Sequence, residues 1–376
     1  MTRRRTIWLW IALTALVISS CGKNEPQAGD DAWEPLTGDT PISFTTKIGA
    51  ETKTGSLSTI STNFHVFAFY QPGVVDDDPL VDYTGTWDDL STQHWTPNFM
   101  YDQPVTWNNN GTPADDSDDY WNYAPIKYWP NNAENTITFW AYSPYYGDYE
   151  HQDFLRLYKS NSVDAYGNNV PGVPEIEFTT DGTRDFLVSD LAKDLSYRGG
   201  NPADGTVSLV FHHTMSWIDF RVKKVDDSDN YDIVLKSIRL ENLCQTAVYK
   251  LDGWGSGWSR VNFSAYDCGV GAGTALDKDE EDRITFPTNG TKLLLIPQAL
   301  RYTAANLEVV YTFHVKGSGG DPVEYEENVR LGKLTTIWEE GKHYTYNVNI
   351  SPGNPIQFTA VAAAWDSEQN GYFNVN

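Results

Sequence analysis

The sequence contains few cysteines and few positively charged residues. Its 376 residues include 3 cysteines, and 27 lysines and arginines stand against 51 aspartates and glutamates, which gives a formal net charge of −24 at pH 7. A surface this acidic repels the phosphates of nucleic acids and the headgroups of anionic lipids. We therefore exclude nucleic acid as a partner and do not expect the protein body to dock on an anionic membrane.

The sequence also lacks the motifs of common catalytic sites. It has no G-x-S-x-G elbow, no H-E-x-x-H, no P-loop and no cysteine with an evident histidine partner. Paired carboxylates are frequent only because the chain holds 51 acidic residues, so they do not indicate glycoside hydrolysis. We predict that the protein is not an enzyme, has no catalytic residues and uses no cofactor.

Long apolar runs are missing except at the N-terminus, where residues 7–18 follow three arginines. This run is too short for a permanent transmembrane helix, which needs about 20 apolar residues, so residues 1–20 are predicted to be a lipoprotein signal peptide. Residues 18–21 (ISSC) resemble a bacterial lipobox, in which the cysteine is acylated and becomes the new N-terminus. We predict that lipid on Cys21 anchors a surface-exposed protein in the outer membrane. The alternative is an ordinary signal peptide in which Cys21 has no role.

Two cysteines remain once Cys21 is assigned to the lipid. Cys244 and Cys268 are close in sequence, and in an oxidising compartment they are able to form a disulfide. A small buried thiol explains Cys244 equally well. The sequence leaves both alternatives open.

Aromatic and turn-forming residues are abundant. The chain holds 14 Trp, 22 Tyr and 16 Phe, and Gly, Asn, Asp, Thr and Pro interrupt almost every segment. This composition is typical of an all-β protein. After a polar tether over residues 21–40, apolar alternation predicts strands at residues 42–48, 63–70, 137–143, 207–222, 233–240, 292–296, 307–315, 343–350 and 356–361. Residues 71–124 are predicted to be a long loop region with short strands, and residues 145–175 to be loop-like.

A Gly-Gly-Asn-Pro sequence within residues 196–205 is the best candidate for a domain boundary. Strands at the spacing seen on both sides of it favour β-sandwiches. We therefore predict an N-terminal β-sandwich domain over residues 41–203 and a C-terminal β-sandwich domain over residues 204–376.

Seven short segments occur in a characteristic order through the chain. They are residues 128–130 (YWP), 137–144 (ITFWAYSP), 185–189 (DFLVS), 207–216 (VSLVFHHTMS), 293–298 (LLLIPQ), 338–346 (WEEGKHYTY) and 356–365 (IQFTAVAAAW). Together they resemble the fimbrillin family of Bacteroidetes, which comprises lipoprotein pilins and pilus-related surface proteins. No segment is diagnostic alone, so the resemblance depends on their order.

The resemblance implies two tandem transthyretin-like β-sandwich domains and assembly into a pilus with other pilin subunits. In related pilins a protease removes the N-terminal segment with its first strand, and the exposed groove accepts a C-terminal strand of the next subunit. Applied here, the removable strand carries Ile42, Phe44 and Ile48 on one face. The donor strand carries Ile356, Phe358 and Ala360, or else lies at residues 372–375.

The N-terminal region departs from the family pattern in its cleavage site. Maturation in the family often follows an arginine, but after the leader the first arginine is Arg156. Lys47 and Lys53 are the candidate cleavage sites near the first strand, with Lys23 further upstream. An uncut subunit would keep its lipid and act as an anchor or a monomeric surface protein, so stalk, tip and anchor roles all stay open.

Three binding alternatives were weighed against structural explanations. The main alternative function is a monomeric surface lipoprotein that binds glycan, because tryptophans in polar loops are able to stack on sugars; these are Trp87, Trp95, Trp107, Trp121, Trp254 and Trp258. A host glycan or protein would then be an additional partner. Acidic stretches at residues 76–78 and 115–119 offer oxygen ligands for calcium but lack the spacing of a calcium loop. His212 and His213 point to opposite faces of a strand, so we predict no metal site there.

Overall fold

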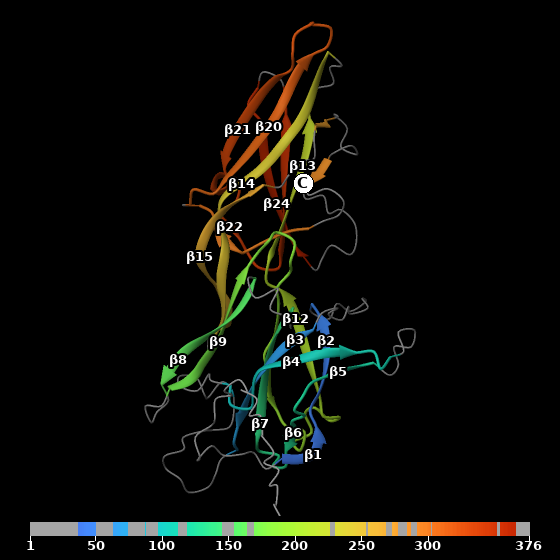
Figure 1. Ribbon diagram of the computed structural model, residues 1–376, viewed down its shortest axis with the longest axis vertical. Coiled ribbons are helices and arrows are strands. Elements are labelled where there is room, and N and C mark those ends of the chain that lie inside the picture. The colour runs from blue at the N-terminus through green and yellow to red at the C-terminus, as the bar shows by residue number, and fades with distance from the viewer. Residues whose placement is uncertain are drawn as a thin grey trace, which may run out of the picture. The chain divides into compact units, whose positions relative to one another are not determined.

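Strands dominate the computed structural model (Figure 1). It describes residues 37–49, 63–73, 87, 97–111, 119–144, 154–163, 169–225, 230–252, 255–267, 273–276, 284–286, 292–301, 303–351 and 354–365. Within these ranges the only helical element is the 3₁₀ turn η4 (Leu331–Lys333). The prediction of an all-β fold is confirmed. No helix in the described part of the chain is long and apolar enough to cross a bilayer.

The first sheet collects strands from residues 43–213. Its order is β2 (Ser43–Ile48), β12 (Thr206–His213), β10 (Leu187–Ser189), β7 (Thr136–Ser143), β3 (Phe64–Gln71), β4 (Met100–Asn108) and β5 (Tyr120–Asn122), and β11 (Ala192–Leu195) also pairs with β7. A separate ribbon joins β1 (Thr37–Pro41) to β6 (Tyr128–Pro130). The two end strands, β2 and β5, also lie close to each other, so the sheet curls.

The centre of this sheet is buried on both faces, as the apolar character of residues 63–70 predicts. In β3, Phe64 and Val66 face one side, whereas Phe67 and Phe69 face the other, and all four are at most 2% exposed. The first core lies on the Phe64 side and comprises Ile42, Phe44, Phe64, Val66, Ala68, Met100, Val105, Trp121, Tyr123, Trp129, Ile137, Phe139, Ala141, Leu187, Val207, Leu209 and Phe211. The Phe67 side belongs to a middle core that includes Trp140, Phe178, Phe186, Tyr249 and Trp365.

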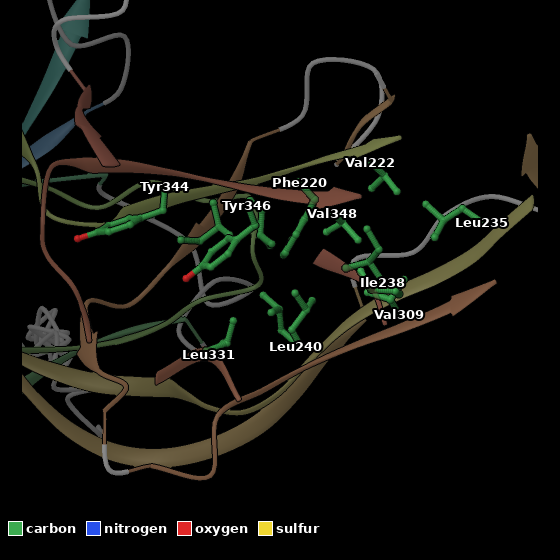
Figure 2. Close-up of a cluster of buried hydrophobic side chains, with 14 of the residues drawn as sticks. Phe220, Val222, Leu235, Ile238, Leu240, Val309, Leu331, Tyr344, Tyr346 and Val348 are labelled. Carbon is green, nitrogen blue, oxygen red and sulfur yellow. The ribbon is translucent and has the colours of Figure 1, made fainter. Parts of the chain in front are cut away.

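Two further sheets enclose a second core. One has the order β17 (Ile284–Phe286), β13 (Ser216–Lys224), β23 (Lys342–Ile350) and β24 (Gln357–Ala364), with β18 (Leu293–Leu295) also on β13. The other has the order β21 (Val323–Arg330), β20 (Asn306–Val315), β14 (Tyr231–Asp252), β9 (Asn169–Thr179) and β8 (Leu155–Val163), with β15 (Gly255–Asp267) and β16 (Thr274–Ala275) also on β14. Figure 2 shows Phe220 and Val348 of the first of these sheets facing Leu240 and Val309 of the second. A short ribbon of β19 (Gln298–Ala299) and β22 (Ile337–Trp338) completes the set.

The two halves of strand β14 pair with different strands. Its first half pairs with β20, and its second half pairs with β15 and β9. Between the two halves the pairing register shifts, and Asn242 adopts φ 58°, a left-handed conformation that asparagine tolerates better than most residues. The bulge therefore lets one long strand serve both the second core and the middle core.

The structure corrects one expectation and leaves another as a prediction. Residues 145–175 are predicted to be loop-like, but they contain β8 and most of β9. These strands pair with each other, and the end of β9 pairs with β14, which overrides a sequence interrupted by Gly, Asn and Pro. Residues 196–205 connect β11 to β12, and both strands belong to the first sheet. The division into two transthyretin-like domains at residues 203–204 remains a prediction.

Candidate functional site at the first edge strand

Strand β2 forms one end of the first sheet. It pairs only with β12 among the described strands, and it runs parallel to that strand with Phe44 opposite Val207 and Ile48 opposite Phe211 (Figure 1). Its sequence alternates apolar and polar residues, which suits a strand with one buried and one solvated face. The strand predicted at residues 42–48 is confirmed.

The inward face of this strand completes the first core. Ile42 and Phe44 are 2% and 4% exposed, Thr46 is 6% exposed, and Ile48 is partly buried against the same core. The ring of Phe44 makes edge contacts with three aromatic rings, at centroid distances of 6.0 Å to Phe64, 5.5 Å to Tyr123 and 5.9 Å to Phe139. The strand is therefore an integral part of a core although it lies at a sheet edge.

Hydrogen bonds hold the two ends of this strand. The Tyr123 hydroxyl donates to the Ile42 carbonyl over 2.9 Å, and the Ile42 amide donates to the Lys127 carbonyl over 2.9 Å. At the far end the Gly49 amide donates to the Phe211 carbonyl over 2.8 Å. Burial raises the pKa of Tyr123 to about 12, so this phenol keeps its proton and acts as a donor.

Removal of β2 would leave a slot with two properties. The edge of β12 would present unpaired backbone groups, and the side chains of Phe64, Phe139 and Tyr123 would lose the Phe44 ring that covers them. An unpaired edge beside an apolar hollow is the arrangement that binds an added strand, because main-chain hydrogen bonds and alternate side chains are satisfied together.

The predicted donor residues lie in or next to another edge strand. Among the described strands β24 pairs only with β23, and the two strands are antiparallel. Ile356 is 8% exposed, whereas Phe358 and Ala360 are only partly buried against the second core. At the end of the strand the Trp365 ring stacks on His213 with centroids 4.0 Å apart. The structure thus shows both strands in place within one chain, and residues 372–375 lie outside the described residues.

The predicted processing residues are only partly covered. Lys47 lies within β2 and pairs with Val210 of β12. Cys21, Lys23 and Lys53 lie outside the described residues, so lipidation and cleavage stay predictions.

The two adjacent histidines face different acidic partners. His212 Nε2 lies 2.9 Å from Asp190 Oδ2, and His213 Nδ1 lies 2.5 Å from Asp185 Oδ2. Both histidines line a cavity together with Glu340, whose pKa is raised because its burial outweighs the opposite effect of the nearby His212. No cluster of three metal-ligating side chains occurs in the described part of the chain.

Most described tryptophans serve the cores. Trp87 is 2% exposed beside Phe69, Trp121 is 9% exposed, and Trp258 is partly buried with its Nε1 donating to a backbone carbonyl. Trp107 is 47% exposed and rests edge-on against Trp121 at 4.8 Å. Trp95 and Trp254 lie outside the described residues.

Two further predictions involve residues outside the described part of the chain. Cys244 is buried, and Cys268 lies outside the described residues, so the disulfide stays open. Residues 76–78 and 115–118 of the acidic stretches also lie outside them, and calcium binding stays open as well.

Three residues around the slot were missed from the sequence. Thr46 faces the core, and strict alternation starting at Ile42 would have predicted this inward position. Trp129 belongs to a family segment, and its Nε1 donates to the Gly205 carbonyl over 2.8 Å beside the start of β12. The sequence around Tyr123 does not indicate its role, because its hydroxyl bonds to the Ile42 carbonyl, 81 positions away.

Comparison with known protein families identifies one family. The profile described as fimbrillin-like matches residues 83–365. A fimbrial protein from Bacteroides vulgatus is 19% identical with a TM-score of 0.62, and the alignment covers 86% of this chain and 99% of that one. Candidate cell adhesion proteins from Bacteroides uniformis and Bacteroides ovatus are 12% and 14% identical, with TM-scores of 0.43 and 0.44, over 87% of this chain and 98% of each of theirs.

No curated protein matches the sequence. The likeness to the Bacteroides vulgatus structure shows a shared fold. The profile match extends over most of the chain, and the seven segments quoted above lie within it. The chain therefore belongs to the fimbrillin-like family.

Proposed function

We propose that this protein is a structural or adhesive subunit of a cell-surface pilus, exported as a lipoprotein and assembled by exchange of an edge strand after removal of β2. One observation carries the proposal: an edge strand close to the N-terminus supplies the buried side chains Ile42 and Phe44 to the first core. Membership of the fimbrillin-like family supports a pilus role.

The energetic argument starts from the cost of an empty slot. Loss of a buried phenylalanine side chain alone costs about 3–5 kcal/mol, which is a large share of the stability of an ordinary domain. The β12 edge would lose its ladder partner at the same time. A subunit without β2 is therefore expected to bind any strand that restores these contacts, and the resulting junction dissociates slowly because it is part of a folded core.

The position of the cleavage site follows from the pairing of β2. The backbone at Lys47 is held in the sheet opposite Val210, whereas proteases need an accessible, extended segment. We therefore favour cleavage at Lys53 over Lys47. A chain that is never cut keeps both its strand and its lipid on Cys21, and serves as an anchor or a monomeric surface protein.

Assembly is tested on a chain that begins at Gly22 and carries a specific protease site after Lys53. Before cleavage it should remain monomeric, and after cleavage and release of β2 it should form ladders that survive mild detergent without heating. Phe358→Asp should abolish the ladder by placing a charge in the apolar slot. Thr359→Asp, at an outward position of the same strand, is the matched control and should assemble.

Lipid anchoring has an independent test. Cys21→Ala should release the protein from the outer-membrane fraction or leave its leader uncut. A Cys21→Ala protein that loses its leader and stays in the outer-membrane pellet would refute the lipoprotein assignment.

Glycan binding is the second candidate function, favoured by the exposure of Trp107. An exposed indole on a polar strand pair is able to stack on a sugar ring. If the cut and uncut chains both stay monomeric at high concentration while the uncut chain pulls down a polysaccharide, and Trp107→Ala abolishes that capture, glycan binding is the better assignment.

A further inference from the structure

Two edge strands of different sheets begin with nearly the same sequence. Residues 41–46 read PISFTT and residues 355–360 read PIQFTA, so proline, isoleucine, phenylalanine and threonine recur at the same spacing. The first segment leads into β2 and the second into β24. In both, the isoleucine and phenylalanine face a core while the threonine after the phenylalanine is exposed.

We propose, on the basis of the strand exchange proposed above, that β24 of a second copy of this chain occupies the β2 slot in one defined register. Ile356 takes the place of Ile42, Phe358 that of Phe44 and Ala360 that of Thr46, and the strand runs parallel to β12. Each chain is then both donor and acceptor for its own kind, which is the property of a stalk subunit.

The side chains fit this register position by position. Phe358 enters the site where Phe44 meets three aromatic rings. Ala360 replaces Thr46, whose hydroxyl is buried and has no hydrogen-bond partner among the described residues, so the smaller apolar residue removes an unsatisfied group. Gln357 takes the place of Ser43, where its amide is able to reach the Thr206 hydroxyl that Ser43 contacts at 2.9 Å.

The backbone contacts of the slot do not depend on the side chain. The Tyr123 hydroxyl donates to the carbonyl of residue 42, and the amide of residue 42 donates to the Lys127 carbonyl. Ile356 offers the same carbonyl and amide, and its predecessor Pro355 corresponds to Pro41. These two hydrogen bonds hold the start of whichever strand occupies the slot, so the side-chain matches described above select the register.

Burial indicates the direction of the transfer. In its own sheet Phe358 is only partly buried and residues 361–364 are exposed, whereas Phe44 in the slot is 4% exposed. Phe358 thus becomes more deeply buried when it moves into an empty slot, and the ladder to β23 that it leaves is replaced by a ladder to β12. The exchange is favourable only after β2 has left.

The register is tested with cysteine pairs on the outward face. Thr45 lies opposite the exposed Ser208, so the proposal puts Thr359 of a second copy there. Chains with Ser208→Cys are mixed with chains carrying Thr359→Cys, and β2 is cut and released from both. A disulfide between the two chains is expected, because cross-strand neighbours lie within disulfide range. Val361→Cys, two residues further on the same face, should yield at least about tenfold less product, which corresponds to roughly 1.4 kcal/mol.

Controls separate this inference from strand exchange itself. Ser208→Cys with Thr45→Cys in one uncut chain should form an internal disulfide, which shows that the site is oxidisable. Uncut mixtures should give no disulfide between chains. The proposed register would be overturned if the cut chains form ladders but Ser208→Cys gives no disulfide with Thr359→Cys, or gives more disulfide with Val361→Cys. Strand exchange itself would remain supported in either case. Absence of ladders from the cut chain would overturn both.

Discussion

The edge strands β2 and β24 are alike in sequence and differ in what holds them. Strand β24 has the longer ladder, with eight paired positions against β23, whereas β2 has six against β12. The residues in and just before β2 are the more deeply buried: Ile42, Phe44 and Thr46 are 2–6% exposed, whereas at β24 Ile356 is 8% exposed and Phe358 and Ala360 are only partly buried. One strand is therefore held chiefly by its side chains and the other chiefly by its backbone.

This difference has a consequence for stability and for assembly. A hydrogen bond of the ladder contributes only about 0.5–1.5 kcal/mol net, because water competes for the same groups, while burial of a large apolar side chain contributes about 1.5–3 kcal/mol. Loss of β2 thus damages a core, and loss of β24 mainly opens a ladder. If strand exchange operates as proposed, the β2 position should bind such a strand more strongly than the β24 position does.

The largest expected effect is a difference in the free energy of unfolding between variants of Phe44 and Phe358. Phe44→Ala should lower the free energy of unfolding by about 3–5 kcal/mol, because it empties a site lined by three aromatic rings. Phe358→Ala should cost about 1–2 kcal/mol, because its side chain is only partly buried. Urea unfolding of both variants of the uncut chain measures the difference, and equal losses would remove the contrast between the strands.

Local opening should differ in the same sense. Amides of β24 should exchange with solvent at least about tenfold faster than those of β2, since a strand with little buried surface opens without global unfolding. Hydrogen exchange of the uncut chain followed by mass spectrometry reports both segments at once. Faster exchange in β2 than in β24 would show that ladder length outweighs side-chain burial.

A smaller effect concerns the hydroxyl that holds the start of β2. Tyr123→Phe should lower stability by about 1 kcal/mol at neutral pH, because the Ile42 carbonyl loses its donor. The folded pKa of about 12 lies above the ordinary value of about 10, so the phenol's contribution is complete below pH 10 and is lost as the pH rises towards 12. The stability gap between the two proteins should therefore narrow at pH 11, as measured by urea titrations at both pH values.

The smallest expected effect lies on the outward face of β24. Val361 is 51% exposed, so Val361→Thr should change the free energy of unfolding by no more than about 0.5 kcal/mol. The variant should also assemble after cleavage like the parent chain. A loss above about 2 kcal/mol would mean that this face is covered by another part of the protein.

Particular segments show how far sequence reasoning reached. Alternation at residues 42–48 predicted β2 and its inward residues Ile42 and Phe44, because a strand with one buried face leaves a period of two in the sequence. The same reasoning missed β8 and β9, which pair with each other, and of the two only β9 pairs with β14, about 70 residues away. It also placed six tryptophans in polar loops as candidate sugar platforms, and of the four described only Trp107 is largely exposed.

The sequence by itself determined the β class, the acidic character and the family, because composition and short ordered segments are local properties of the chain. Only the tertiary structure decided that β2 closes the first core at a sheet edge, that Tyr123 holds its start and that β24 is loosely buried in its own sheet. Those properties depend on which distant strands become neighbours. Two segments with nearly the same sequence are buried to different depths because their surroundings, rather than their own residues, set how much surface each one buries.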